Sequence, residues 1–197
     1  MTPCAIALVL AIDVSGSVSL PHYELQRDAT ADALNSPAVI SAARDGLAVS
    51  AIMWGTGQHV VLPWRVLTSA ANARAAAEAL RQAQRPEAGT TNMAAALRAA
   101  HAEFRAAPCQ AERRVVDISG DGRHSGGDAE MHGAVAEVAG YGVEINALAI
   151  VTPIEPEVAA WFRANVTGPA GGFTLEAEPE SFGRAIRMKL AMEVAQR

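Results

Sequence analysis

The sequence predicts a single α/β domain, residues 1–197, built on a doubly wound, mostly parallel, Rossmann-like sheet of six strands with helices on both faces. Short apolar runs alternate with helical stretches along the chain, which is the pattern of such a sheet. Half of the 197 residues are hydrophobic, enough for a substantial core, and no shift in composition marks a domain boundary. The turn Gly55-Thr56-Gly57 is too short for a crossover, so one edge strand is expected to be antiparallel.

The first half of the chain begins with an aliphatic run closed by turn residues, which is typical of a buried parallel strand. Pro21 suits the first turn of the helix that follows, and Asn35-Ser36-Pro37 ends that helix. Ser69 is expected to cap a later, alanine-rich helix. The elements expected here are strands at residues 5–12, 46–54 and 59–62 and helices at residues 22–35 and 69–82.

In the second half of the chain, glycine-containing turns separate the elements. Gly120-Asp121-Gly122 ends a strand, Ser125-Gly126-Gly127 leads into a helix, and Gly171-Gly172 introduces a final short strand. The elements expected here are helices at residues 93–106, 129–140, 156–165 and 180–195 and strands at residues 113–119, 143–151 and 173–175.

The charge balance and hydropathy exclude two classes of protein. Basic residues number 16 and acidic residues 21, a net charge of −5, and neither sign forms a long run. Because nucleic-acid binding needs a basic stripe, we expect no nucleic-acid partner. No apolar segment approaches the ~20 residues that span a bilayer, so no membrane span is expected. The first apolar run lacks a preceding basic segment and a cleavage site, so we predict a strand, with any leader peptide absent from this chain.

The two cysteines, Cys4 and Cys109, each precede a predicted strand. If those strands are parallel neighbours, both thiols lie at the end of the sheet opposite Asp13, where a disulfide is sterically feasible. The bridge would close a loop of about a hundred residues, worth roughly 4 to 5 kcal/mol in the chain-entropy model. It would also indicate an oxidising, extracytoplasmic compartment, either periplasmic or secreted. The alternative is two unrelated thiols in a cytosolic protein.

Oxygen-bearing side chains follow the first strand at alternate positions, as Asp13, Ser15 and Ser17. Open parallel sheets bind ligands at this edge, and converging oxygen atoms suit a hard divalent cation. Taken alone, Asp-x-Ser-x-Ser is explained equally well as a turn or a helix cap. However, Thr90-Thr91 at a helix entry and Asp121 after the fourth strand reach the same edge. We therefore predict that three loops converge on one cation.

With these residues considered together, the chain resembles a von Willebrand factor A domain that carries a metal-ion-dependent adhesion site. That motif has Asp-x-Ser-x-Ser after the first strand, a threonine in a later loop, and Asp-Gly after the fourth strand. The resemblance covers nearly the whole chain. It implies a metal site made of Asp13, Ser15, Ser17, Thr91 and Asp121.

Two details refine this resemblance. Thr91 is preferred to Thr90 because the family's threonine stands two residues after a glycine, as Thr91 does after Gly89. Residues 13–19, the surroundings of Trp54 and of Leu62-Pro63-Trp64, and residues 117–122 resemble bacterial, exported A-domain proteins of unknown function.

The expected donor set favours particular metals. Serine and threonine hydroxyls are neutral, so they offset less of a cation's charge than an all-carboxylate cage would. If one carboxylate binds directly and the other through water, a coordination position stays open to a carboxylate of a partner. An octahedral oxygen site at ~2.1 Å with retained waters suits Mg²⁺, with Mn²⁺ or Ca²⁺ as alternatives. The motif contains no His or Cys, so zinc or copper is not expected.

Asp117 is unusual because it places a carboxylate inside an apolar strand, where burial without a partner is costly. It alternates in phase with Ser119 and Asp121, so one interpretation is that it supports the metal site from beneath. The other is a structural hydrogen bond or salt bridge to Arg113 or Arg114.

Other polar and aromatic residues near this edge have simpler interpretations. His124 is predicted to be a solvated loop histidine, the alternative being a ligand contact that depends on pH. Asp128 is predicted to cap the helix that follows it rather than to surround the metal. Trp54 and Trp64 are expected in the core or at its rim rather than as a ligand platform.

The predicted function is a divalent-metal-dependent adhesion or protein-binding module, and not an enzyme, in which the metal binds an acidic group of a protein partner. One alternative is a Mg²⁺-dependent phosphotransferase or hydrolase with Asp13 as nucleophile. Haloacid-dehalogenase-type enzymes, however, have a second Asp where this chain has Ser15, and no Gly-x-x-x-x-Gly-Lys loop occurs. The other alternative is a structural domain with a closed metal site. The oligomeric state is left open.

Overall fold

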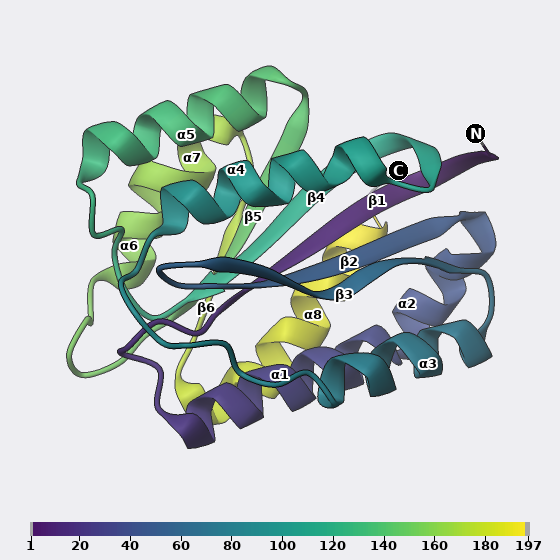
Figure 1. Cartoon of the computed structure of the whole chain (residues 1–197), viewed down its shortest axis with the longest axis horizontal. Helices are drawn as coiled ribbons and strands as arrows, with labels where there is room; N and C mark the ends of the chain where they lie inside the picture. The colour runs from purple at the N-terminus through teal and green to yellow at the C-terminus, as the bar shows by residue number, and fades with distance from the viewer. Residues whose placement is uncertain (1, 196–197) are drawn as a thin grey trace.

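The computed structural model describes residues 2–195 and has a six-stranded sheet at its centre (Figure 1). The strands in this part of the chain are β1 (Thr2–Asp13), β2 (Leu47–Trp54), β3 (Gln58–Leu67), β4 (Cys109–Gly120), β5 (Val143–Ile150) and β6 (Thr174–Ala177). Their order is β3-β2-β1-β4-β5-β6, and every neighbouring pair is parallel except β2 and β3. The predicted fold class and the antiparallel edge strand are confirmed.

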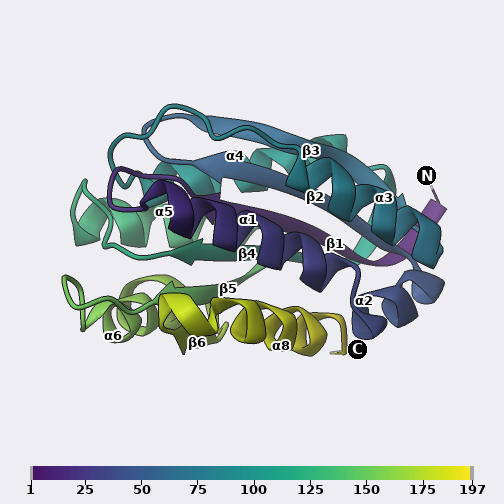
Figure 2. The same cartoon turned by 90° about the horizontal axis from the view of Figure 1, so that it is seen from below.

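Helices cover both faces of the sheet. The α-helices in the described residues are α1 (Leu20–Leu34), α2 (Pro37–Ala42), α3 (Ala70–Arg81), α4 (Met93–Glu103), α5 (Asp128–Gly140), α6 (Val158–Phe162), α7 (Gly168–Ala170) and α8 (Phe182–Ala195). Helices α1, α2, α3 and α8 lie on one face, and α4, α5, α6 and α7 lie on the other, as the two views show (Figures 1 and 2). The sheet is therefore the middle of three layers.

Strand β1 is buried on both sides, which explains its nearly continuous apolar sequence. Leu8 and Leu10 belong to the core cluster beneath α1, α3 and α8, whereas Val9 and Ala11 belong to the cluster beneath α4 and α5. All four side chains are at most 2% exposed. A strand buried on both faces reads as an apolar run rather than as an alternating pattern.

Several elements differ from the expected bounds. Strand β3 continues to Leu67 instead of ending at residue 62. Pro63 is tolerated because β3 is an edge strand, where proline does not remove a central ladder bond. Pro37 does more than end α1: it begins α2, and the Ser36 side chain accepts a hydrogen bond from the Val39 amide as the N-cap. Strand β4 begins at Cys109, earlier than the predicted residue 113, because residues 109–111 pair with residues 2–4 of β1.

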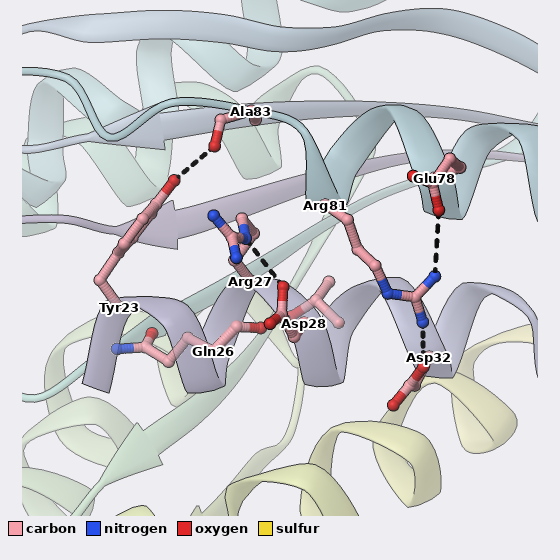
Figure 3. A network of polar contacts seen from close by, with 9 residues as sticks. Tyr23, Gln26, Arg27, Asp28, Asp32, Glu78, Arg81 and Ala83 are labelled. Atoms are coloured by element: carbon pink, nitrogen blue, oxygen red, sulfur yellow. Dashed lines mark hydrogen bonds and ion pairs between the residues drawn. The ribbon is translucent and has the colours of Figure 1, made fainter. Parts of the chain in front are cut away.

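Polar contacts join α1 to α3 and to the loop that follows α3 (Figure 3). The Tyr23 hydroxyl donates a hydrogen bond of 2.8 Å to the Ala83 carbonyl, and Arg81 forms an ion pair with Asp32. The Tyr23 contact holds the segment that leads into the 85–92 loop against the N-terminal half of α1, and the Arg81 contact joins the end of α3 to the C-terminal half of α1. That loop carries residues that reach the candidate site described below.

A disulfide joins Cys4 of β1 to Cys109 of β4, which confirms the feasible pairing and rules out two free thiols. The bridge lies near the amino ends of these parallel strands, and Asp13 lies at the carboxyl end of β1. Crossing a bilayer takes a longer and more apolar helix than any found between residues 2 and 195.

Candidate metal centre

The candidate site lies where the strand order changes direction. Strand β1 has β2 on one side and β4 on the other, so the chain leaves the carboxyl ends of β1 and β4 toward opposite halves of the sheet. Such a switch point leaves a crevice at the strand ends, where α/β proteins bind ligands. Ile12 is aligned with Ser119 in the sheet, so Asp13 and Asp121 leave adjacent strands at the same edge.

Asp13 is fully buried and is held by its own loop. Its Oδ1 accepts a 2.7 Å hydrogen bond from the Ser15 amide, whereas its Oδ2 is buried without a hydrogen-bond partner. Gly120 of β4 makes room for this carboxylate. A methyl group at Gly120 would lie 2.9 Å from Asp13 Oδ2 and 3.2 Å from the Trp54 ring, so any larger side chain there would displace one of them.

The loop that follows β1, residues 14–19, is called the first loop below, and its serine side chains reach toward β4. The hydroxyls of Ser15 and Ser17 are 3.2 Å apart, and the Ser17 hydroxyl donates a 2.5 Å hydrogen bond to Asp121 Oδ1. Asp13, Ser15, Ser17 and Asp121 thus form one continuous series of polar contacts across two strand ends. The structure brings together these four residues, as the sequence predicted.

The two threonines of the 85–92 loop point to different surroundings. The Thr90 hydroxyl is 3.2 Å from the hydroxyl of Thr56 on the exposed side. Thr91 faces the β4 loop instead, since a methyl group at Gly122 would lie 3.7 Å from the Thr91 hydroxyl. The 85–92 loop is also joined to the first loop, because the Gly16 amide donates a 2.8 Å hydrogen bond to the Gly89 carbonyl.

Arg85 is a part of the site that sequence reasoning missed. Its guanidinium donates hydrogen bonds to three carbonyls of the first loop, those of Val14 at 3.1 Å, Ser15 at 3.1 Å and Val18 at 2.6 Å. It also lies over the ring of Tyr23. Arg85 therefore fixes the backbone that carries Ser15 and Ser17. No motif or spacing in the sequence links Arg85 to that loop, so this contact could not be predicted from the sequence.

The electrostatics of the site suit a cation. The pKa of Asp13 is raised to about 7, mainly because burial disfavours the charged carboxylate and in smaller part because Asp121 lies nearby, while hydrogen bonds from Ser15 oppose the rise. A divalent cation next to Asp13 and Asp121 would favour the charged form of both carboxylates, which opposes the effect of burial on Asp13. Across residues 2–195, His, Cys, Asp and Glu side chains nowhere gather in threes to hold a metal, so a cation here needs the hydroxyls as well. The unpartnered oxygen of Asp13 and the adjacent hydroxyls fit a hard, oxygen-preferring ion.

His124 is buried, which corrects the prediction of a solvated loop histidine. Its Nδ1 is 3.3 Å from the Thr91 carbonyl oxygen, and its Nε2 is 3.2 Å from Glu130 Oε2. Ser125 also donates from its amide and its hydroxyl to the Thr91 carbonyl, each at 3.0 Å. The glycine-rich loop after Asp121 therefore holds the backbone of Thr91 in place.

Asp128 and Asp117 have other partners than expected. Asp128 is the first residue of α5 rather than its cap, which is Gly127, and its carboxylate accepts a 3.0 Å hydrogen bond from the Trp161 indole. Asp117 pairs with Lys189 of α8 and not with Arg113 or Arg114, and it lies away from the metal edge in the interior between β4 and α8. Its partner comes from a distant helix, so local sequence did not identify it.

The two tryptophans have the predicted structural positions. Trp54 is fully buried beside Asp13 and Gly120. Trp64 is partly buried, and its indole donates a 2.9 Å hydrogen bond to the Glu103 carbonyl. Neither offers an exposed ring to a ligand.

Comparison with family models places residues 3–197 in a family described as "Protein of unknown function (DUF1194)". A comparison with curated proteins gave no match.

Solved structures with the same fold include a von Willebrand factor type A protein from Catenulispora acidiphila, with a TM-score of 0.70 and 19% identity over 98% of this chain and 44% of that one. The conserved hypothetical protein BatB from Bacteroides thetaiotaomicron has a TM-score of 0.69 and 16% identity over 98% of this chain and all of its own. Proximal thread matrix protein 1 from the mussel byssus, solved with a zinc-occupied metal-ion-dependent adhesion motif, has a TM-score of 0.65 and 16% identity over 97% of this chain and 46% of its own.

This chain spans less than half the length of the Catenulispora and mussel chains. At these identities the likeness concerns the fold, which is that of a von Willebrand factor A domain. The resemblance inferred from the motifs is therefore confirmed at the level of architecture.

Proposed function

This chain belongs to the family described as protein of unknown function DUF1194, and we propose that it is a protein-binding module whose contact with a partner depends on a divalent cation. The cation would be held by Asp13, Ser15, Ser17, Thr91 and Asp121. It would supply positive charge and an open coordination position for an acidic group of the partner.

One observation carries this proposal: the fully buried Asp13 keeps one carboxylate oxygen without a hydrogen-bond partner, and polar contacts link this residue through Ser15 and Ser17 to Asp121. A buried carboxylate that lacks a compensating contact is costly. Such a cost is typical of a site arranged for function rather than for stability. A cation is the ligand that offsets it, because it meets both carboxylates and the neutral hydroxyls at once.

The neutral hydroxyls support a binding role over a purely structural one. Two carboxylates carry just enough negative charge to balance a divalent ion, and the hydroxyl ligands add none. The bound ion would therefore still attract an acidic group of a partner. Ser17 and Gly16 are exposed at this edge, so the site opens to solvent on the side of the first loop. An acidic side chain of a partner can approach from that side.

The side chains around the site give little support to catalysis. His124, the histidine next to the Thr91 loop, faces the Thr91 carbonyl and Glu130 rather than Ser15 or Ser17. A serine hydroxyl needs a base within hydrogen-bond reach to act as a nucleophile. We therefore propose a module that is not an enzyme and expect no hydrolysis of an aryl phosphate in Mg²⁺.

The disulfide supports an extracytoplasmic location, either periplasmic or secreted. Structural disulfides persist in oxidising compartments and are rare where thiols are kept reduced. Mg²⁺ is the proposed metal, with Mn²⁺ and Ca²⁺ as alternatives. Zn²⁺ belongs in the test because the mussel protein of the same fold was solved with zinc at its motif.

Calorimetric titration of Mg²⁺, Mn²⁺, Ca²⁺ and Zn²⁺ into EDTA-treated protein tests the proposal. We expect one saturable site that is lost in an Asp13→Ala, Asp121→Ala double variant. The matched control is Asp28→Ala, which removes an exposed carboxylate on α1 that pairs with Arg27. Binding that persists in the double variant, or that is absent from the unmodified protein, would refute the proposed site.

A further inference from the structure

A groove of about 740 Å³ has two residues of the candidate metal centre in its lining. These are Ser17 and Asp121, which are joined by the 2.5 Å hydrogen bond. Residues 151–154 and 156, between β5 and α6, form one wall, and residues 178–180, between β6 and α8, form another. The groove is therefore continuous with the site to which the proposed function assigns the cation.

The wall made by residues 151–156 is apolar and exposed. Ile154 is 88% exposed, although it is a large aliphatic residue, and Pro153 and Pro156 line the groove beside it. The two prolines restrict the backbone on either side of this isoleucine. An apolar side chain that binds here meets a surface that loses little conformational entropy on contact.

The wall made by residues 178–180 is acidic. Glu178 and Glu180 line the groove, both are exposed, and neither has an ion-pair partner in the part of the chain that the structure describes. In contrast, Glu155, which stands between Ile154 and Pro156 in the sequence but does not line the groove, is paired with Arg123 at 3.3 Å. The groove thus combines two unpaired carboxylates with a site for an acidic group at Ser17 and Asp121.

We propose that this groove binds an extended peptide segment of a partner that combines three side chains: an acidic one, an apolar one and a basic one. The acidic group reaches the metal centre, the apolar side chain packs on Ile154 and its prolines, and the basic side chain meets Glu178 and Glu180. This inference rests on the proposed function. It adds a charge preference to that function, because Glu178 and Glu180 favour a basic side chain in addition to the acidic one.

The test uses short fluorescent peptides with one Asp, one Leu and one Lys on a Gly/Ser background, and matched peptides with Asn, Ser or Glu at those positions. Fluorescence anisotropy is measured in Mg²⁺ and in EDTA. We expect binding in Mg²⁺ that is lost in EDTA and in Asp13→Ala. We expect Ile154→Ser to weaken it by roughly three- to tenfold, the effect of leaving one apolar contact unmade.

Charge reversal is the sharper measurement. In Glu178→Lys, Glu180→Lys, the preference for Lys over Glu in the peptide should reverse, with a change in the ratio of about tenfold or more. Glu157→Lys is the matched control, because Glu157 is exposed nearby but does not line the groove.

The two proposals fail in different ways. Mg²⁺-dependent binding that Asp13→Ala abolishes, but whose peptide preference is the same in the reversed variant, would overturn the groove and leave the metal-dependent function in place. Absence of any Mg²⁺-dependent peptide binding would overturn both. Self-association of the chain that Ile154→Ser abolishes would make a second copy the occupant and would also overturn the peptide inference.

Discussion

The Nζ atom of Lys189 lies 2.6 Å from Asp117 Oδ1, an ion pair that joins helix α8 to strand β4 in the interior of the protein. The same ammonium lies 2.6 Å from Glu193 Oε1, one turn further along α8. Asp117 is 2% exposed, and Lys189 and Glu193 are fully buried. Two carboxyl groups thus share one cation, and each keeps one oxygen, Asp117 Oδ2 and Glu193 Oε2, without a hydrogen-bond partner.

A proton on Glu193 resolves this imbalance. The pKa of Glu193 is raised to about 8, first because burial disfavours its charge and next because Asp117 is close, while Lys189 acts in the opposite direction. A protonated Glu193 has a hydroxyl to donate to Asp117, so the three groups together become neutral. The folded state therefore holds a proton, from the usual pKa of about 4.5 up to about 8, that the unfolded chain has released.

The first prediction concerns this proton. Because the folded state binds more protons in that window, the free energy of unfolding should fall as pH rises from 5 to 8, by at most about 1.4 kcal/mol per pH unit from this group. Glu193→Gln keeps the shape and removes the titration, so its unfolding free energy should fall less steeply than that of the unmodified protein. Urea unfolding at several pH values measures both slopes. Glu137→Gln, which alters an exposed pair with Arg98, should keep the original slope; an unchanged slope in Glu193→Gln would contradict the shared proton.

The second prediction concerns the cost of the buried Asp13. Asp13→Asn retains an oxygen for the Ser15 amide and removes the buried charge next to Asp121. In metal-free buffer it should be as stable as the unmodified protein or more stable by roughly 1 kcal/mol, as expected when an uncompensated buried charge is removed. The unmodified protein should gain about 2.7 kcal/mol at a metal concentration 100 times its Kd, and the variant should gain nothing. Denaturant unfolding with and without Mg²⁺ provides the comparison. A metal-free variant less stable by several kcal/mol would show that the charge is compensated already.

The third prediction concerns Arg85. Arg85→Ala removes three hydrogen bonds to the first loop and should lower the affinity for the cation by about tenfold or more, because groups that orient ligands typically have effects of this size. Stability should fall by roughly 1–3 kcal/mol. The calorimetric titration used for the metal measures the first effect. Arg98→Ala, which removes an exposed arginine of α4, serves as the control, and equal metal affinity in both variants would argue against a positioning role.

The fourth prediction separates stability from binding at the disulfide. The Cys4–Cys109 bridge spans 105 residues in sequence and lies at the end of the sheet opposite the candidate site. Cys4→Ser, Cys109→Ser should therefore lose about 4 to 5 kcal/mol of unfolding free energy. In conditions where the variant stays folded, its metal affinity should equal that of the oxidised protein within about twofold, because every proposed ligand is far from the bridge. Reduction of the unmodified protein should reproduce both results. A parallel loss of metal affinity would mean that the bridge also holds the site.

The sequence alone determined the architecture of this protein and the edge of the sheet at which its oxygen-bearing residues gather. Both follow from local patterns: apolar runs closed by turn residues mark strand ends, and the carboxyl ends of parallel strands lie on one edge. Asp13, Ser15, Ser17 and Asp121 were placed together by this reasoning, and the structure places them in mutual contact. Their role as metal ligands, with Thr91, stays a prediction for the titration above.

Only the tertiary structure decided which side chains hold that edge and the interior in place. Arg85 binds the first loop across a long sequence separation, His124 is buried against Thr91, and Asp117 finds Lys189 on the final helix. Such partners depend on which faces of distant elements pack together, whereas periodicity and turn residues describe only the nearest neighbours along the chain. A charged residue inside an apolar strand, such as Asp117, indicates from the sequence alone that it needs a partner. Which residue is that partner depends on how α8 packs against β4.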